Sequence, residues 1–531
     1  MKKKIVSIVL ALTVSGILMC ACSSTAPAPE PEKEAQEEKT ETESEPEKEA
    51  EPDKEPEAEK EAEKKDETAA APEGLGLTIT KEFVSRTDDE GKVVAYGYYP
   101  VIKSEGKDHE KLAAALDDMT AKLKADVESN LDDIEGMAKE DIANGRDLPG
   151  GYYTYYCEPL VTRGDENVLS IVFTYDTYSG GAHPSEWYLT KNFDAKTGEE
   201  LHIANVITDP SALPKVLSEK LLSEYDKEIF FDEDVDKLIR EGYEEDQNYE
   251  YTLDNSGICF YFSQYQLAPY ASGAQITVLG YDEYADLVKE EYAKKDGDYI
   301  EGIVPQKKYT ASGKNVFSLF YYPNSDDDYE YELDYTFNGK DGSENITCCG
   351  MQPYIVKKGN NYYLYLNELQ MNDYQSIDVY TIEDSGFKKK GTCERGFRYL
   401  GPTDPENFDL AGRTDMLSTN ETYRSYRVGD DGMPVPNEEY DHIIGSVSEK
   451  LTLKKDIEAE VYADENATES KKETLEKGTV LYYLRTDNET FVDMKTEDGR
   501  VVRFHPETKE YPQTVDGTDI EELFDGVMFA G

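Results

Sequence analysis

The sequence is poor in basic residues. Its 531 residues contain 56 Lys and Arg against 113 Asp and Glu, which gives a formal net charge of −57. A surface that binds nucleic acid needs clustered cations to displace the counterions condensed on the phosphates, so this balance excludes nucleic acid as a partner. The same excess of negative charge would attract a basic protein over long distances and speed its encounter with the chain.

Histidine is also scarce, and the motifs of known catalytic sites are missing. No two of the five His stand at metal-ligand spacing on one expected helix or strand; they are His109, His183, His202, His442 and His505. No Ser or Cys nucleophile motif adjoins His183, and no phosphate-binding loop is present. We therefore predict that the chain is not an enzyme and uses no metal or cofactor.

Long apolar runs are limited to one, near the N-terminus. Lys2 to Lys4 precede an apolar run from Ile5 to Met19, which is shorter than the roughly 20 residues that a membrane-spanning helix needs. This order is typical of a secretory signal peptide, predicted here at residues 1–21, with an uncleaved membrane anchor as the alternative. The overlapping segment Leu18 to Ser24 resembles a bacterial lipoprotein box, which implies that Cys22 receives a lipid. We expect the protein on the outer face of the cell membrane, held by this lipid anchor, in a Gram-positive bacterium.

The lipidated Cys and an acidic tether make up residues 22–73. Residues 23–73 hold 20 Asp and Glu against 7 Lys, mixed with Pro and Ala, for a net charge of −13. Such a stretch buries too little apolar surface to offset the entropy lost on ordering, so we predict that it is disordered. The remaining residues, 74–531, still carry a net charge of −47.

Residues 75–292 mix helix and strand patterns. One helix is expected after Asp108 as its N-cap, with apolar residues from Leu112 to Val127 at three- and four-residue spacing, and another after Asp209-Pro210. Aromatic and β-branched segments predict strands at 93–102, 152–161, 168–175, 187–193, 257–262 and 274–279. The predicted fold class is an α+β body, a mostly antiparallel sheet with helices on one side.

Three motifs in this region carry a family resemblance. They are Gly180-Gly181-Ala182-His183-Pro184, Phe193-Asp194-Ala195-Lys196-Thr197-Gly198-Glu199-Glu200-Leu201, and Phe260-Tyr261-Phe262 running into Tyr265-Gln266-Leu267-Ala268-Pro269-Tyr270. With them the region resembles the extracytoplasmic domain of the RsiV-type anti-sigma factors, whose two parts also precede the catalytic domain of PdaC-type peptidoglycan deacetylases. The resemblance implies a PdaC-like α+β domain at 75–165 and an RsiV-like domain at 166–292. RsiV-type proteins are receptors for lysozyme, so it also implies a binding role.

Two features of these families have no counterpart here. Only Lys2 to Lys4 precede the apolar run, where the anti-sigma factors carry a sigma-binding segment. No deacetylase domain with a metal-binding Asp and spaced His residues is present either. We therefore expect adhesion, without a direct anti-sigma role and without deacetylation.

The motif residues are the candidate binding site. Gly180-Gly181 allows a tight turn that presents His183, which either contacts a partner or closes the turn by a hydrogen bond from its ring to a backbone carbonyl. Tyr265, Pro269 and Tyr270 either grip a glycan or a protein loop, or complete a core, as aromatic residues at strand ends often do.

One acidic run could hold a calcium ion. Asp326-Asp327-Asp328 with Glu330 offers the oxygen ligands that Ca²⁺ prefers, but it lacks the Gly and the distant Glu of an EF-hand loop. A solvated hairpin turn is the favoured interpretation.

Seven Cys are present, of which Cys20 leaves with the signal peptide and Cys22 is lipidated. The other five cannot all pair internally; they are Cys157, Cys259, Cys348, Cys349 and Cys393. Cys157 and Cys259 could bridge two strands, and at most one of the adjacent Cys348 and Cys349 could reach Cys393. Buried free thiols are the alternative.

The rest of the chain is expected to be all-β. Aromatic-rich segments between Asn, Asp and Gly turns predict strands at 316–322, 329–337, 352–356, 362–366, 377–382 and 423–428, within a β-rich domain at 300–445. Residues 446–510 resemble a bacterial SH3-like wall-binding domain through Lys477-Gly478 and the Asp498-Gly499 hairpin. That resemblance implies a barrel, with Phe491 and Phe504 at its aromatic positions, and leaves 511–531 as a tail.

Two functions remain open. The first is a surface-anchored, non-enzymatic binding protein whose acidic body docks a basic extracellular protein, with a lysozyme-like hydrolase as the leading candidate. The second is a module that binds peptidoglycan or another wall polymer and maintains the envelope without such a partner.

Overall fold

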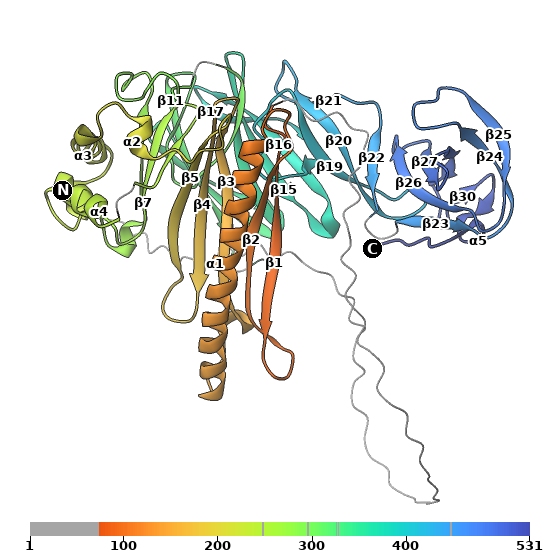
Figure 1. The fold of residues 1–531 in the computed structure, drawn as a ribbon, viewed down its shortest axis with the longest axis horizontal. Coiled ribbons are helices and arrows are strands. Elements are labelled where there is room, and N and C mark those ends of the chain that lie inside the picture. The colour runs from red at the N-terminus through yellow and green to blue at the C-terminus, as the bar shows by residue number, and fades with distance from the viewer. Residues whose placement is uncertain are drawn as a thin grey trace, which may run out of the picture. The chain divides into compact units, whose positions relative to one another are not determined.

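The computed structural model describes residues 74–246, 249–294, 297–324, 327, 329–445 and 449–530. They form a sheet-rich α+β body followed by several all-β sheets, so the predicted fold class is confirmed (Figure 1). The predicted signal peptide, Cys22 and the tether lie outside the described residues. No helix in the described ranges has the length and apolar character that crossing a membrane requires.

A five-stranded sheet opens the described chain. Its strands lie in chain order, β2 and β3 run parallel, and the other neighbours run antiparallel. They are β1 (Leu77–Thr87), β2 (Val93–Ser104), β3 (Tyr153–Gly164), β4 (Val168–Tyr178) and β5 (Ser185–Asp194). The sequence patterns predicted β2 to β5 and missed β1, because β1 buries few of its side chains and shows no clear apolar alternation.

Helix α1 (Glu110–Ala143) follows β2, and a 3-10 turn at Pro149–Gly151 then leads into β3. The helix packs against β1, β2 and β3 (Figure 1). The predicted apolar spacing is confirmed, since its buried residues are Leu112, Leu116, Met119, Leu123, Val127, Leu131, Ile134 and Ala138. The predicted N-cap at Asp108 is wrong. Asp108 has a φ of 69°, in the left-handed region, and His109 occupies the cap position instead.

The predicted domain boundary at residues 165 and 166 falls inside this sheet. The Asp165 carboxylate accepts hydrogen bonds from the backbone N–H groups of Asn167 and Val168, both at 3.0 Å, and closes the turn between β3 and β4. β3 and β4 then pair along most of their length. The sheet therefore extends through both predicted domains, because a hairpin cannot be divided without breaking its ladder.

A second layer follows β5. It contains α2 (Ile203–Val206), α3 (Leu213–Glu224) and α4 (Val235–Asp246), and an antiparallel sheet of β6 (Tyr251–Leu253), β7 (Gly257–Phe262) and β8 (Gln275–Gly280). Short 3-10 turns lie at Pro210–Ala212, Lys227–Ile229 and Tyr270–Ser272. The predicted helix start at Asp209-Pro210 is confirmed, since the Asp209 carboxylate accepts the Ser211 N–H at 3.0 Å just before α3.

Two sheets then pack face to face as a sandwich. The first joins β10 (Tyr309–Ala311), β11 (Asn315–Pro323), β12 (Glu330–Phe337) and β13 (Lys340–Thr347). The second joins, in hydrogen-bonded order, β17 (Gly386–Cys393), β16 (Gln375–Glu383), β15 (Asn361–Leu369), β14 (Gly350–Lys358) and β9 (Tyr299–Gly302), with a 3-10 turn at Met371–Asp373. Phe317 and Leu333 of the first sheet share one core with Ile355 and Leu364 of the second. The sequence missed β13 because its side chains are mostly exposed.

The last part is one extended β structure. Its sheet contains β18 (Gly396–Phe397), β19 (Phe408–Thr414), β20 (Asn420–Val428), β21 (Pro434–Pro436), β22 (Asp441–Ile444), β23 (Lys450–Leu453), β24 (Ile457–Tyr462), β25 (Ser470–Leu475), β26 (Val480–Thr486), β27 (Val492–Thr496), β28 (Val501–Phe504) and β32 (Phe524–Asp525). A small sheet of β29 (Pro506–Glu507), β30 (Thr514–Val515) and β31 (Thr518–Asp519) precedes α5 (Ile520–Leu523).

The barrel implied for residues 446–510 is not closed among the described strands. β26 pairs with β22 as well as with β23 and β27, so the strand path continues into the preceding sheet. The segment expected as a tail is also part of the fold. Ile520, Leu523 and Phe524 are buried in the same core as Phe504, because apolar side chains remain in this stretch and pack there.

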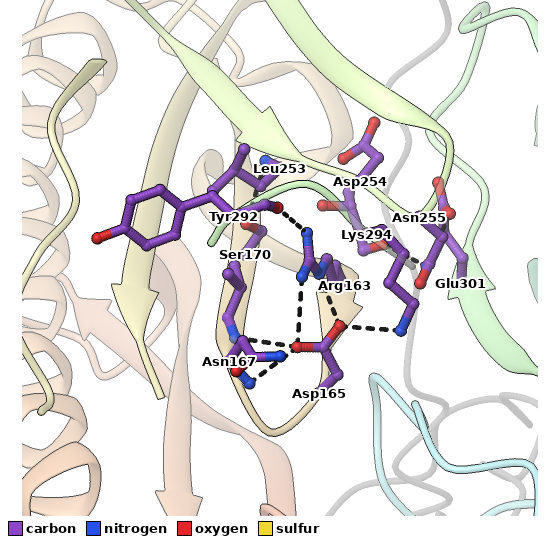
Figure 2. A network of polar contacts seen from close by, with 12 residues as sticks. Arg163, Asp165, Asn167, Ser170, Leu253, Asp254, Asn255, Tyr292, Lys294 and Glu301 are labelled. Carbon is purple, nitrogen blue, oxygen red and sulfur yellow. Dashed lines mark hydrogen bonds and ion pairs between the residues drawn. The ribbon is translucent and has the colours of Figure 1, made fainter. Parts of the chain in front are cut away.

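Buried ionic contacts join the α+β body to the sandwich. Lys307 is nearly inaccessible and pairs with Asp254 at 2.6 Å and with Glu301 at 2.7 Å. Figure 2 shows the neighbouring cluster, in which Arg163 and Lys294 both contact the Asp165 carboxylate. Burial alone would raise the pKa of Asp165, but these two cations hold it well below its usual range.

None of the five described Cys forms a disulfide bond. The two bridges that the sequence left open are therefore not formed, and the alternative of buried free thiols is confirmed for Cys157, Cys259 and Cys348. Cys157 lies in the core beneath α1, whereas Cys259 lies in a separate core between the five-stranded sheet and the sheet that contains β7 and β8. Burial raises the pKa of both thiols, which leaves them in the unreactive protonated form.

Candidate functional site

One face of the five-stranded sheet carries a row of side chains that crosses every strand. The register pairs Phe83 with Tyr98, Tyr98 with Tyr156, Tyr156 with Asp176, and Asp176 with Glu186. The rings of Tyr98 and Tyr156 stack with their centroids 4.8 Å apart. The row is thus aromatic on β1 to β3 and acidic on β4 and β5, since directly opposed residues share a face.

The glycine turn at the end of β4 brings the two carboxylates together. Gly180 and Gly181 have φ values of 91° and 108°, which side-chain-bearing residues rarely adopt. A Cβ on Gly180 would also lie 2.8 Å from the hydroxyl of Tyr153. The turn reverses the chain so that Glu186 returns beside Asp176.

His183 leaves this turn and packs on the Tyr270 ring. Its Nδ1 donates a hydrogen bond to the carbonyl of Pro184 at 2.8 Å, which matches the structural interpretation of this histidine. The imidazole and the Tyr270 ring stack with centroids 3.7 Å apart and planes 19° apart. The Tyr270 ring in turn lies 5.8 Å from that of Tyr265. His183 thus forms one aromatic group with Tyr265 and Tyr270, which lie far along the chain from it.

Tyr265 is the outermost member of this group. Its side chain is 59% exposed and its φ is 67°, so the backbone turns it outward. The interpretation of Tyr265 as a core residue is therefore wrong. Pro269 is also exposed, and it precedes the 3-10 turn that contains Tyr270. Tyr270 is only partly exposed, so it supports the aromatic group from below.

The acidic end of the row has unusual protonation. Burial and, to a smaller extent, the charge of Glu186 raise the pKa of Asp176 to about 7. Burial likewise raises the pKa of Glu186. Burial, followed by the charges of Glu186, Tyr265 and Asp176, raises the pKa of Tyr270. One proton shared between the two carboxylates near neutral pH would relieve their repulsion.

Several polar atoms of this site have no partner among the described residues. Oδ1 of Asp176 and the hydroxyl of Tyr270 are buried without a hydrogen bond, and neither Asp176 nor Glu186 forms an ion pair with a described Lys, Arg or His. Glu186 has only a long contact, 3.4 Å, from the hydroxyl of Tyr188. A buried polar group without a partner is costly, so this site can accept a cationic donor such as a guanidinium.

The structure thus brings together five of the six predicted site residues and leaves Pro269 at their edge. Their role in binding stays a prediction. Sequence reasoning missed Asp176 and Glu186. The sequence did show that Asp176 takes a polar position in the alternation of β4, as Ser170 and Thr174 do. Without the register, however, nothing connected Asp176 to Glu186.

The candidate metal sites have less support in the structure. Within the described ranges, no group of three or more His, Cys, Asp or Glu residues is placed to hold a metal ion. Asp326 and Asp328 of the acidic run lie outside the described residues. The Asp327 carboxylate accepts the backbone N–H of Tyr329 at 2.9 Å, in the turn between β11 and β12.

Comparisons with known proteins bear on the first half of the chain. Residues 90–186 match the family model described as deacetylase PdaC, and residues 205–282 match that of a protein family of unknown function, DUF3298. The predicted resemblance to the extracytoplasmic region of RsiV- and PdaC-type proteins is therefore confirmed. These matches indicate an extracytoplasmic, envelope-associated pair of domains. No curated protein matches the chain.

Solved structures of the same family also resemble the chain. A DUF3298 family member from Bacteroides fragilis is 20% identical, covers 41% of this chain and 96% of its own, and has a TM-score of 0.31. A DUF3298 family protein from Pseudomonas aeruginosa PAO1 is 13% identical, covers 43% of this chain and 100% of its own, and has a TM-score of 0.28.

Proposed function

We propose that this chain is a lipid-anchored, non-enzymatic binding protein on the extracellular face of the cell membrane, and that its acidic–aromatic site docks a basic extracellular protein. A lysozyme-like wall hydrolase is the leading candidate for that partner. The site is defined as Asp176, Glu186, His183, Tyr265 and Tyr270.

One observation carries the proposal. Asp176 and Glu186 face one another on adjacent strands with no described cation to pair with, and the turn that joins these strands carries His183 of the aromatic group. A charge-assisted hydrogen bond contributes roughly 1.5–3 kcal/mol, and a guanidinium offers several donors in one plane. An Arg or Lys side chain from a partner would therefore relieve the repulsion between these carboxylates, while Tyr265 packs on its apolar stem.

The charge of the whole chain supports the same kind of partner. A net charge of −57 produces a field that attracts a basic protein and repels an acidic one. Such steering changes the association rate most, and it weakens as salt shortens the range of the field. The paired carboxylates would then supply the short-range specificity that the general field lacks.

The surroundings of His183 favour binding over catalysis. Its Nδ1 proton is engaged by the Pro184 carbonyl and one ring face lies against Tyr270, so the imidazole acts as part of the aromatic group. No described Ser or Cys side chain forms a hydrogen bond with this ring.

Calorimetric titration of residues 23–531 with hen lysozyme tests the proposal. This chain keeps every described residue, including Lys307, which a fragment ending at residue 292 would lose. We expect saturable binding that weakens as salt is raised from low to moderate concentration. A flat response together with retention on isolated peptidoglycan would reject the proposal and favour the wall-polymer function.

A further inference from the structure

We propose that a groove on the opposite face of the same sheet binds a neutral oligosaccharide. This groove lies between α1 and strands β3 to β5 and has a volume of about 580 Å³. Clefts of roughly 300–1,000 Å³ with mostly apolar walls and a few polar groups are typical of small-ligand sites. Because neighbouring residues of a strand point to opposite faces, Trp187 lines this groove while Glu186 belongs to the acidic–aromatic site.

The groove exists because α1 covers only part of the sheet. The helix packs against β1, β2 and β3, whereas β4 and β5 extend beyond it. Of the side chains that line the groove there, Trp187 and Leu189 are partly exposed, whereas Tyr175 is buried. Met119 and Leu123 of α1 form the facing wall.

The floor of the groove is a set of three rings. Tyr175 and Trp187 stack with their centroids 5.2 Å apart and their planes only 8° apart, and Tyr155 meets both of them edge-on at 5.9 Å. Trp187 lies on β5, the edge strand, and no further described ring stacks on it. Flat aromatic faces carry negative π density, which attracts the weakly positive C–H faces of a pyranose ring.

The rim supplies hydrogen-bonding groups whose charges nearly cancel. Lys122 pairs with Asp118 at 2.6 Å, and Lys191 pairs with Glu200 at 2.7 Å. That leaves Asp126 as the one acidic lining residue outside these two pairs.

The position of Asp126 ties the rim to the floor. It accepts hydrogen bonds from the hydroxyl of Tyr155 at 3.2 Å and from Nδ2 of Asn130 at 3.3 Å. Ligand hydroxyl groups can both donate to the carboxylates and accept from the two lysines, so they match a charge-paired rim.

Charge decides between the ligand classes that an aromatic groove could hold. The lining carries two Lys against three acidic residues within a chain of net charge −57. This local balance favours a neutral polar ligand, because an anionic one is repelled by the surrounding field and a cationic one would find stronger sites elsewhere. A purely aliphatic ligand would leave the rim groups unmatched. A neutral sugar polymer of one to a few rings satisfies both floor and rim.

Tryptophan fluorescence gives a direct test, because Trp187 is the single Trp of the chain. Residues 23–531 would be titrated with cellotetraose and tetra-N-acetylchitotetraose as neutral probes, and with tetragalacturonate as an anionic control. We expect a saturable change in Trp187 emission with at least one neutral probe at up to millimolar concentration, and none with the anionic one. No change with either neutral probe, in a chain with native circular dichroism, would overturn the proposal.

Variants separate this site from the acidic–aromatic site. Calorimetry should show that Trp187→Ala weakens binding by about tenfold or more, and that Asp126→Asn weakens it several-fold. Lys122→Ala, at an exposed rim position, tests the rim if the Trp variant unfolds. Two control variants should leave the affinity for the oligosaccharide unchanged. They are Asp133→Asn, on an exposed turn of α1 outside the groove, and Tyr265→Ala, in the acidic–aromatic site. Equal affinity in the groove variants and the controls would contradict the assignment.

Discussion

Two pairs of carboxylates in this protein lie in opposite circumstances. Asp254 and Glu301 are fully buried, and Lys307 stands between them within 2.7 Å of each. Asp176 and Glu186 are partly buried, face each other across two strands, and have no cation among the described residues. The first pair shows how this fold neutralises acidic groups that it needs for its own stability.

The difference points to a role outside the fold for the second pair. Removing a carboxylate from water without a partner costs free energy, which the raised pKa of Asp176, about 7, records. Lys307 behaves in the opposite way: burial would lower its pKa, but Asp254 and Glu301 raise it well above the ordinary value. The fold thus completes one acidic pair internally and leaves the other open to a cation from outside.

Removing Lys307, the buried cation, should change the free energy of unfolding more than any other substitution considered below. Lys307→Met leaves Asp254 and Glu301 buried without a positive partner, and breaking a buried ion pair in this way costs about 3–5 kcal/mol. Urea unfolding of residues 23–531 measures the loss. The control is Lys314→Met, whose ion pair with Asp384 is exposed and should contribute less than about 1 kcal/mol. Similar losses in the two variants would remove the contrast between buried and open pairs.

Neutralising a carboxylate of the second pair, Asp176 and Glu186, should instead stabilise the fold. Asp176→Asn removes a carboxylate whose folded-state pKa, about 7, exceeds its unfolded value. Below the unfolded pKa, near 4, both states are protonated and the variant should match the parent in stability. Stability of the parent then falls as pH rises from about 4 to 7, because the folded state holds the proton longer.

The measurement is the difference in free energy of unfolding between Asp176→Asn and the parent across that range. The variant should be more stable at pH 8 by on the order of 1–3 kcal/mol. A destabilised variant at pH 8 would mean that the ionised carboxylate has a favourable partner within the fold.

Binding should depend on the same two carboxylates. The double variant Asp176→Asn with Glu186→Gln should weaken the affinity for lysozyme by about tenfold or more, since it removes the acceptors for a cationic side chain. The control double variant Asp89→Asn with Glu90→Gln makes the same change in net charge in the exposed turn between β1 and β2. If both double variants lose affinity equally, only the long-range field matters and the site has no specific role.

Replacing the exposed Tyr265 should have the smallest effect on stability and on lysozyme binding. Tyr265→Ala should leave the free energy of unfolding within about 0.5 kcal/mol, because the ring is 59% exposed, and should weaken lysozyme binding several-fold. Tyr329→Ala removes another exposed ring, 48% exposed, far along the chain on the β11–β12 turn, and should change neither quantity. A loss of stability without loss of affinity would return Tyr265 to a structural role.

Much of the fold followed from local patterns. The apolar spacing of α1, the Asp209-Pro210 start before α3 and the strand β7 were predicted from residues that decide their own conformation. Strands β1 and β13 were missed because they lie at sheet edges and expose most of their side chains. The closed barrel was wrong because β26 also pairs with β22, and strand pairing over that distance leaves no local trace in the sequence.

The candidate site was predicted in part for the same reason. Gly180, His183 and Tyr270 belong to motifs, so they could be recognised before their contacts were known. Asp176 and Glu186 belong to no motif, and their importance arises from cross-strand register and from burial. A sequence with 113 acidic residues offers no way to single out two of them without the fold.

Proton release on binding tests the open pair most directly. Calorimetric titration with lysozyme at pH 7 would be repeated in buffers of different ionisation enthalpy, which reveals the protons exchanged. If a cation from the partner pairs with Asp176, its pKa falls and about half a proton per complex should be released at pH 7, in the parent chain but not in Asp176→Asn. Saturable binding without any proton release, or the same release from both proteins, would contradict the account.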